Sequence, residues 1–217
     1  MTLAFIGLWI AALFGSAGTF SWIRGWICFG LYVVGVGAAG NMAKRYNPTL
    51  VEARSDWMPA ETKRFDKIIL SIYYPLIYVQ LAVAGLDARR FHWTHMPFAF
   101  VYLGVALFAI AMVSVGSVMA VNRFAATTVR IQTERGHTVC DSGPYRYVRH
   151  PMYVGAVLMY ISTPLILGSL WALAVGGVIV ALMVCRTALE DRTLRRELPG
   201  YADFATRTRY RLLPGIW

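Results

Sequence analysis

The residues best suited to chemistry gather in two short stretches in the second half of the chain. The first, residues 122–155, reads NRFAATTVRIQTERGHTVCDSGPYRYVRHPMYVG and concentrates ionisable and aromatic side chains in a chain that otherwise avoids polarity. The second ends the last apolar run and contains Arg186 and Glu190, whose spacing of four places both on one face of a helix. Carboxylate, imidazole, guanidinium and phenol groups in such a setting could bind a charged ligand.

Each stretch also has a purely structural interpretation. Residues 122–155 could be a basic loop anchored by interfacial aromatic rings, which composition alone favours. Arg186 could be a snorkelling arginine paired with Glu190. However, arginine before glutamate is the weaker order for such a pair, which contributes only about 0.2–0.5 kcal/mol. Because ionisable residues near membrane depth are functional candidates by default, both interpretations stay open.

The elements that position these residues are predicted to be membrane-spanning helices. Of the 217 residues, 58% are hydrophobic and 15% are charged, against about 25% charged in soluble domains. A helix crosses the hydrocarbon core with about 20 apolar residues, and no segment shows the period-two alternation of a strand. We therefore predict an all-α, multi-pass transmembrane helical bundle of five or six spans, at residues 3–20, 25–43, 68–86, 97–121, 152–168 and 170–189.

The charge distribution predicts the orientation of these spans. The net charge of +10 would suggest a nucleic-acid partner in a soluble protein, but the basic residues lie in the connections between apolar spans. With six spans, 18 of the 21 basic residues fall on the side that carries segments 44–67 and 122–150 and the C-terminal tail. The positive-inside rule makes that side cytoplasmic. We expect no nucleic-acid partner.

Three weaker patterns have ordinary explanations. The segment Gly35-Val-Gly37-Ala-Ala-Gly40 matches the dinucleotide fingerprint GxGxxG, but it lies inside a predicted span, where close helix packing is the better interpretation. His92 and His95 lie at the entrance of a span without a third ligand nearby. The three cysteines form no CxxC pair, so we expect neither a disulfide framework nor a metal site.

Taken together, the two stretches resemble the isoprenylcysteine carboxyl methyltransferase family, in particular its shorter, bacterial-type members. The resemblance covers residues 122–217 and rests on GPYRYVRHPMYVG, on the Arg186/Glu190 pair and on the ending LPGYADFATRTRYRLLPGIW. Residues 1–121 match mainly in hydropathy, with the addition of NPTLVEAR at 47–54. The RHPxYxG segment is fairly specific, although sterol-reductase-like membrane proteins carry a similar one.

The resemblance implies an integral membrane enzyme that binds S-adenosylmethionine in a cytoplasmic pocket and takes a lipophilic acceptor from the bilayer. Residues 1–121 would form the helical frame and residues 122–217 the catalytic part. Arg186 would orient the acceptor, and Glu190 would act in catalysis and meet the cofactor. Together with Arg149, which is added on chemical grounds, the expected cofactor-binding residues are Gln132, His137, Thr138, Val139, Cys140, Tyr145, Arg149, His150, Pro151, Met152, Tyr153 and Glu190.

These residue types suit the expected chemistry. S-adenosylmethionine is a sulfonium that also carries an ammonium group, which Glu190 or Gln132 could bind, and a carboxylate, to which His150 or Arg149 could donate. The tyrosines could face the sulfonium through cation–π contact. Methyl transfer is an in-line displacement that neutralises charge, so that alignment and exclusion of water can supply much of the catalysis.

Arg186 bears on the acceptor. A guanidinium can hold a carboxylate bidentately, and a carboxylate is already ionised at neutral pH, whereas a thiol or an amine would need a base. The sequence therefore favours a carboxylate acceptor, such as the α-carboxyl group of an isoprenylcysteine-like molecule. Two alternatives remain, an NADPH-dependent membrane reductase of the sterol-reductase type and a non-catalytic membrane subunit.

Overall fold

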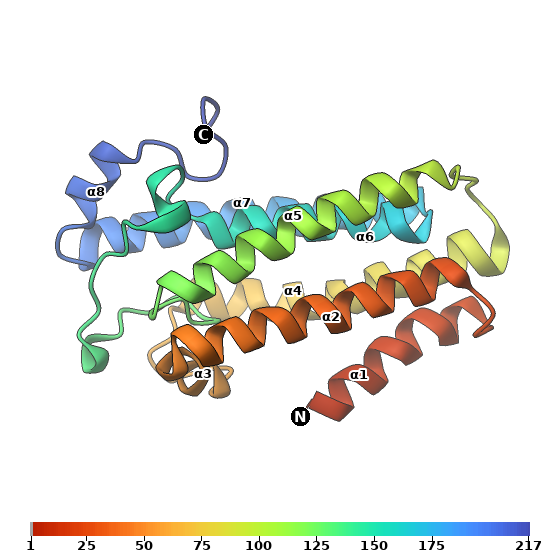
Figure 1. Cartoon of the computed structure of the whole chain (residues 1–217), viewed down its shortest axis with the longest axis horizontal. Coiled ribbons are helices and arrows are strands. Elements are labelled where there is room, and N and C mark those ends of the chain that lie inside the picture. The colour runs from red at the N-terminus through yellow and green to blue at the C-terminus, as the bar shows by residue number, and fades with distance from the viewer. Residues whose placement is uncertain (1) are drawn as a thin grey trace. The chain divides into compact units, whose positions relative to one another are not determined.

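The computed structural model describes residues 2–217, with side chains from residue 5 onward, and every regular element in this part of the chain is helical (Figure 1). The prediction of an all-α fold is confirmed. The long helices are α2 (Ile23–Tyr46), α4 (Arg64–Gly85), α5 (Ala99–Val121), α6 (Pro151–Leu167) and α7 (Leu170–Glu197). The shorter elements are α1 (Thr2–Ile10), η1 (Ala11–Gly15), α3 (Pro48–Ser55), η2 (Leu86–Phe91), η3 (Thr133–Arg135), η4 (Gly143–Arg146) and α8 (Tyr201–Arg207).

Each of the six predicted spans contains a helix. Four helical segments are long and apolar enough to cross a membrane, namely α2, α4 continued by η2, α5 and α7. The first apolar segment, at Phe5–Gly15, and α6 are apolar but shorter. Because a helix rises about 1.5 Å per residue, the 28 residues of α7 are about 42 Å long, which exceeds the hydrocarbon core of about 30 Å.

The helix boundaries follow from local chemistry. Pro48 opens α3 and Pro151 opens α6, each at the first helical position, where the missing N–H costs nothing. The sequence places Pro151 directly after His150, so that the motif His-Pro marks a helix start. Between α6 and α7 the chain turns at Gly168, whose φ of +81° is a conformation that glycine adopts without strain.

The chain forms two compact units, each made of three separate segments. Unit 1 consists of Met1–Gly35, Ser71–Ile110 and Val157–Leu182. Unit 2 consists of Val36–Leu70, Ala111–Ala156 and Met183–Trp217. Every residue of the expected cofactor and acceptor site belongs to unit 2. The functional division at residue 121 stays a prediction, because these units reflect packing and not activity.

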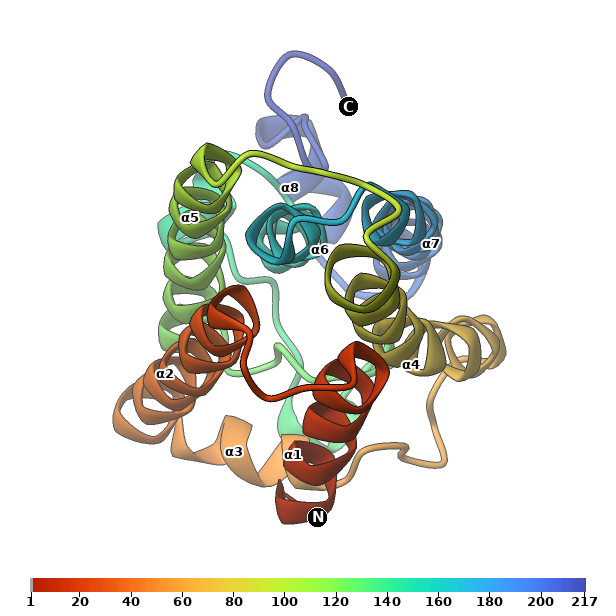
Figure 2. The same ribbon diagram turned by 90° about the vertical axis from the view of Figure 1, so that its right-hand side faces the viewer.

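In unit 1, α6 lies between α5 and α7 (Figure 2). The helices approach closely at glycines: a Cβ on Gly104 would lie 2.9 Å from the backbone nitrogen of Ile166, and one on Gly176 would lie 2.7 Å from the carbonyl oxygen of Tyr160. The buried Gln80 amide donates to the Tyr160 carbonyl at 2.9 Å. Small residues and polar side chains of this kind hold helices together where lipid removes the hydrophobic driving force.

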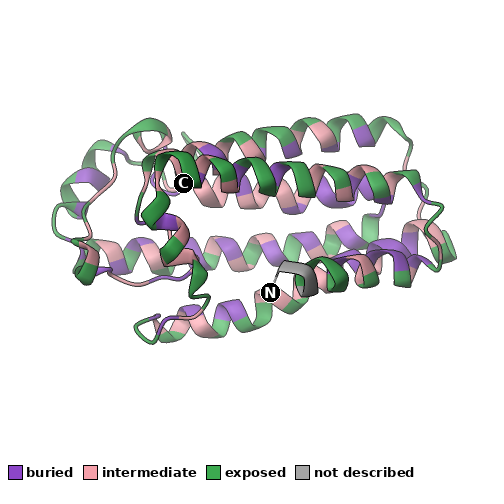
Figure 3. Ribbon diagram, turned by 60° about the horizontal axis from the view of Figure 1, so that its bottom comes forward, coloured by how far each residue is buried: buried purple, intermediate pink, exposed green. Residues whose placement is uncertain are grey.

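The long helices expose many residues (Figure 3), and large hydrophobic side chains are among them. Val34, Tyr102 and Val113 are each at least 70% exposed although they lie on long apolar helices. Large hydrophobic surfaces of this extent are rare on soluble monomers. They agree with an integral membrane protein whose helices contact lipid.

In unit 2, the glycine of the RHPxYxG segment has a packing role. A Cβ on Gly155 would lie 2.9 Å from the carbonyl oxygen of Ala111 and 2.8 Å from the Val115 side chain. Nearby, the Ser114 hydroxyl donates to the Pro151 carbonyl at 2.7 Å. Gly155 therefore lets the start of α6 approach α5, which fixes the position of the preceding loop.

The GxGxxG segment does not have the packing role expected of it. The segment is helical, without the strand–turn–helix setting of a dinucleotide site. A Cβ on Gly37 or on Gly40 would meet no atom within 4 Å. The prediction of close helix packing at these two glycines within the chain is therefore wrong.

Candidate functional site

One buried carboxylate organises the C-terminal part of unit 2. Asp191, on α7, has no exposed surface. Its Oδ1 accepts from Arg149 Nε at 2.7 Å and from the Tyr201 hydroxyl at 3.0 Å, and it lies 3.2 Å from His150 Nε2. Its Oδ2 accepts from Arg211 Nε at 3.1 Å. Asp191 thus joins the RHP segment, α8 and the C-terminal tail to the last long helix.

Arg149 and His150 are tied to the tail through their backbone as well. The Arg149 N–H donates to the carbonyl of Tyr210 at 2.9 Å, and the His150 N–H donates to that of Arg211 at 3.0 Å. Arg149 Nη1 donates to the Thr208 and Arg209 carbonyls, and its Nη2 donates to Asp191. Arg149 would have to exchange one of these partners to bind a cofactor carboxylate.

A second cluster brings together three residues of the expected site. The Tyr153 hydroxyl, on α6, donates to the Glu190 carboxylate in a very short hydrogen bond. The Arg186 guanidinium lies 5.3 Å from the centre of the Tyr153 ring, in cation–π geometry. Phenol, carboxylate and guanidinium are therefore adjacent where α6 begins and α7 ends.

Arg186 has an ion-pair partner that the sequence analysis missed. Its Nε and Nη2 donate to the two carboxylate oxygens of Asp66 at 2.6 and 3.1 Å, and Nη2 also donates to the Thr127 carbonyl at 2.8 Å. Asp66 is fully buried in α4 and accepts from the Val129 N–H at 2.7 Å. The pair ties α4, α7 and the loop at residues 122–132 together.

Residues on both sides of η3 contact Phe124. The buried Gln132 amide donates to the Phe124 carbonyl at 2.8 Å. The His137 ring packs on the Phe124 ring at 4.5 Å between centres, and its Nδ1 accepts from the Gln132 N–H at 3.3 Å. Burial, reinforced by the charges of Arg135 and Arg130, lowers the pKa of His137 to about 4, so this imidazole is neutral at physiological pH.

The remaining expected residues line the same region of unit 2. The backbone of Thr138, Val139 and Cys140 runs outside every helix, which leaves peptide groups free of helical pairing. The Tyr145 hydroxyl accepts from the Asn122 amide at 2.6 Å, and burial raises the pKa of Tyr145. Met152 Sδ lies 4.0 Å from Arg54 Nη1.

Four positioning residues escaped the sequence analysis as parts of the site. They are Asp66, Asn122, Tyr201 and Arg211. Asp66 had a weak signal, because it is one of only 11 acidic residues and borders an apolar run. Asp191 is a fifth such residue, although a buried guanidinium such as that of Arg149 requires a counter-charge.

The donor set fits a ligand that carries both positive and negative groups. Glu190 is half-buried and contacts Tyr153, which leaves carboxylate capacity for an ammonium group. The buried hydroxyls of Thr127 and Thr128 have no hydrogen-bond partner among the described residues, and Thr127 is the residue whose carbonyl binds Arg186. Unsatisfied buried hydroxyls beside a cation are what a bound polar ligand would explain.

The fold and this cluster define a class, that of multi-pass helical membrane proteins with a polar site at the helix ends. Comparison with known proteins narrows the class. Residues 99–199 match the model of the family described as phospholipid methyltransferase. This match contains the RHPxYxG segment and the Arg186/Glu190 pair. Over this segment the chain is similar to that family of methyltransferases, in agreement with the predicted resemblance.

One curated relative is similar over a longer range. The chain is 28% identical over 135 residues to the cobalt-zinc-cadmium resistance protein CzcN of Cupriavidus metallidurans. The similarity covers 61% of this chain and 58% of the length of that protein. Within the described residues, no three His, Cys, Asp or Glu side chains are placed to hold a metal ion together.

Replacing Asp191 by asparagine should destabilise unit 2. The variant keeps the shape of the side chain but leaves the buried Arg149 guanidinium without its counter-charge, a loss of about 3–5 kcal/mol for a broken buried pair. The unfolding midpoint in detergent should fall accordingly. Asp203→Asn, an exposed acid on α8, is the matched control and should change stability by less than about 0.5 kcal/mol. Equal midpoints for the two variants would contradict the role of Asp191.

His137 should make stability depend on pH. An unperturbed imidazole has a pKa near 6.5, whereas His137 in the folded protein has a pKa of about 4. Between these pH values His137 binds a proton in the unfolded chain but not in the folded protein. The free energy of unfolding therefore falls as pH decreases from about 6.5 to 4. His137→Gln should flatten this part of a plot of unfolding midpoint against pH. The exposed His95→Gln should not, and equal slopes for wild type and His137→Gln would be the opposing result.

Proposed function

We propose that this protein is an S-adenosylmethionine-dependent methyltransferase that acts on a lipophilic acceptor at the cytoplasmic face of a membrane. The observation that carries the proposal is the contact of Tyr153, Glu190 and Arg186 inside a segment that matches a methyltransferase family. The cytoplasmic placement is supported by the 18-to-3 division of basic residues.

The cofactor would be held by groups already present in unit 2. The Glu190 carboxylate would bind its ammonium group, and the backbone from Thr138 to Cys140 would supply further hydrogen bonds. The Tyr153 ring makes a cation–π contact with the Arg186 guanidinium, and it could make the same kind of contact with a sulfonium. S-adenosylmethionine supplies an activated methyl group when bound. The protein then needs only to align it with the acceptor and to exclude water.

Arg186 would orient the acceptor. Asp66 occupies its Nε and Nη2, and Nη1 remains to donate to an acceptor carboxylate. Asp66 also fixes the direction of the guanidinium, which preorganises it for one approach. A carboxylate needs no base, so this arrangement favours carboxyl O-methylation of an isoprenylcysteine-like molecule. Methylation of a phospholipid amine, which the family description suggests, would require a proton acceptor.

The reductase alternative uses the same loop with a different cofactor, and the subunit alternative uses none. Both can be tested in one titration. Purified protein in detergent should bind S-adenosylhomocysteine with saturation in calorimetry and should not bind NADPH. Binding of NADPH alone would favour the reductase, and folded protein that binds neither compound would favour the subunit.

Glu190→Gln should weaken S-adenosylhomocysteine binding, because a charge-assisted hydrogen bond to the ammonium group would be lost. A contribution of about 1.5–3 kcal/mol corresponds to roughly 10-fold to 100-fold weaker binding. Glu197→Gln, an exposed acid about two turns further along the same helix, is the matched control. Unchanged affinity in Glu190→Gln would contradict the assignment.

Arg186 variants separate acceptor orientation from cofactor binding. Arg186→Ala alone would leave the buried Asp66 without a counter-charge, so the double variant Asp66→Asn with Arg186→Gln is the better probe. It should bind S-adenosylhomocysteine as the wild type does while turnover of lipophilic acids is lost. The exposed Arg192→Gln should keep both properties. Lost cofactor affinity with retained turnover at saturation would reverse the roles of Arg186 and Glu190.

A further inference from the structure

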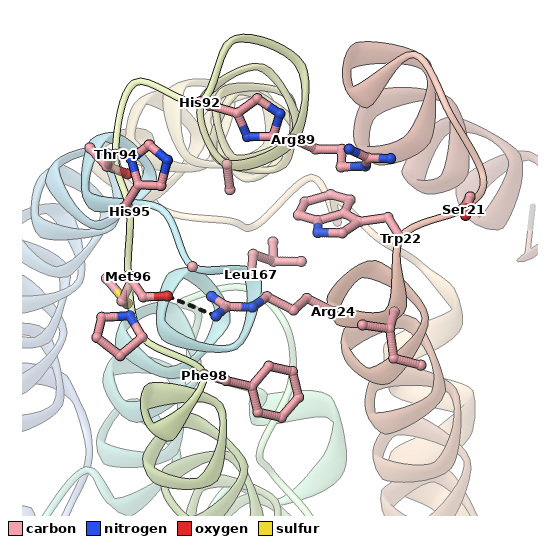
Figure 4. Close-up of a pocket in the computed structure, with 14 residues that line it drawn as sticks. Ser21, Trp22, Arg24, Arg89, His92, Thr94, His95, Met96, Phe98 and Leu167 are labelled. Carbon is pink, nitrogen blue, oxygen red and sulfur yellow. Dashed lines mark hydrogen bonds between the residues drawn. The ribbon is translucent and has the colours of Figure 1, made fainter.

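Unit 1 contains a second polar site, which the proposed methyl transfer does not use. A pocket of about 580 Å³ lies among the start of α2, the end of η2, the connection before α5 and the end of α6 (Figure 4). All of its lining residues belong to unit 1, whereas every residue expected to bind the cofactor or the acceptor belongs to unit 2.

The lining carries the positive charges of Arg24 and Arg89, and none of the lining residues is acidic. His92 and His95 also line the pocket. The acid closest in sequence, Asp87, is buried, and its Oδ2 accepts from the Ser169 hydroxyl at 2.5 Å and from the Thr94 hydroxyl at 2.8 Å. Because Ser169 in turn caps the Ala172 N–H of α7 at 2.9 Å, Oδ2 of Asp87 is committed to that helix start, whereas its buried Oδ1 has no hydrogen-bond partner among the described residues.

Arg24 is held in place by several contacts. Its Nη2 donates to the Met96 carbonyl at 2.7 Å, and its guanidinium lies 5.3 Å from the centre of the Phe98 ring. A Cβ on Gly168 would lie 1.8 Å from Arg24 Nη1, so only glycine leaves space for the guanidinium there. Figure 4 shows the Arg24 side chain reaching across toward Met96 beneath Trp22.

The second guanidinium of the pocket, that of Arg89, has no counter-charge among the described residues. Arg89 is half-buried and forms no ion pair with the acids that the structure describes. His92 has a φ of +53°, the only described residue other than glycine with a positive φ. Non-glycine residues in this conformation store strain, which persists where the surroundings require that placement. Two guanidinium groups and no acidic side chain line the pocket, which therefore suits an anionic ligand.

The surroundings indicate where that anion comes from. The pocket lies at the ends of the membrane-spanning segments α2, α4 with η2, and α5. The exposed Ile23 and Phe98 line it, and the exposed Phe20, Phe91 and Trp93 are sequence neighbours of lining residues. Aromatic rings of this kind mark the level of lipid headgroups, and arginine is the residue that best matches phosphate geometry.

We propose that this pocket binds the phosphate of an anionic lipid headgroup, with Arg24 and Arg89 as the principal donors. Free phosphate offers the same chemistry and is the other source to distinguish. Such a site would couple the packing of unit 1 to the lipid composition of the membrane, because Arg24 bridges α2 to the connection before α5.

The proposal can be tested by native mass spectrometry of the full-length protein in detergent. The probes are phosphatidylglycerol, phosphatidylcholine and inorganic phosphate, and the double variant Arg24→Gln with Arg89→Gln is compared with wild type. Wild type should retain phosphatidylglycerol more strongly than phosphatidylcholine, and the double variant should retain at least about 10-fold less phosphatidylglycerol, since each charged hydrogen bond contributes about 1.5–3 kcal/mol. Arg90→Gln, a neighbouring arginine outside the pocket lining, should behave as wild type does.

Further measurements distinguish a lipid ligand from free phosphate and test whether the pocket is the binding site. Displacement of phosphatidylglycerol by millimolar inorganic phosphate would identify a free anion as the ligand and overturn the lipid assignment. Equal retention in the double variant and in Arg90→Gln would overturn the site. If the double variant does not fold, Arg89→Gln alone should still reduce retention. Gly168→Ala, which keeps every charge but displaces the Arg24 guanidinium, should reduce it too. Unchanged retention in these two single variants would equally reject the proposal.

Discussion

The structure of unit 2 depends on the buried carboxylate of Asp191. Three guanidinium groups, one imidazole and one phenol converge on it from the loop before α6, from α7, from α8 and from the tail. A buried charge is tolerated only when it is paired and hydrogen-bonded, so these elements cannot separate without a large electrostatic cost. The RHP segment is consequently fixed at the start of α6, which also fixes Tyr153 one turn later beside Glu190.

A second buried carboxylate, Asp66, does the same for the acceptor side of the candidate site. It holds Arg186 from α7 and the Val129 N–H of the loop. Two buried acids therefore fix two neighbouring parts of unit 2. Asp191 fixes the position of the loop that would bind the cofactor, and Asp66 fixes the orientation of the Arg186 guanidinium that would bind the acceptor. Asp66 binds Nε and Nη2 of Arg186, so Nη1 remains available for a ligand. Glu190 accepts from Tyr153 and keeps further capacity to accept hydrogen bonds.

The sequence predicted the helices well and the site incompletely, for a physical reason. Apolar runs and Pro151 are local signals, and each predicted span contains a helix. The expected site residues from Gln132 to Tyr153 and the Arg186/Glu190 pair all fall in one compact unit. Asp66 and Asp191 were missed as organisers because their partners lie 120 and 42 residues away in sequence, and no periodic pattern encodes such pairing. The same holds for the cationic pocket of unit 1, which joins Arg24 to a connection 72 residues further on.

The central claim is that unit 2 binds S-adenosylmethionine through the loop and the end of α7. Photo-crosslinking of the detergent-solubilised protein with radiolabelled S-adenosylmethionine, followed by peptide mapping, tests this claim most directly. We expect label in peptides that contain residues 132–153 or 186–190, blocked by S-adenosylhomocysteine and not by NADPH. Label confined to peptides of unit 1, or protection by NADPH alone, would contradict the account.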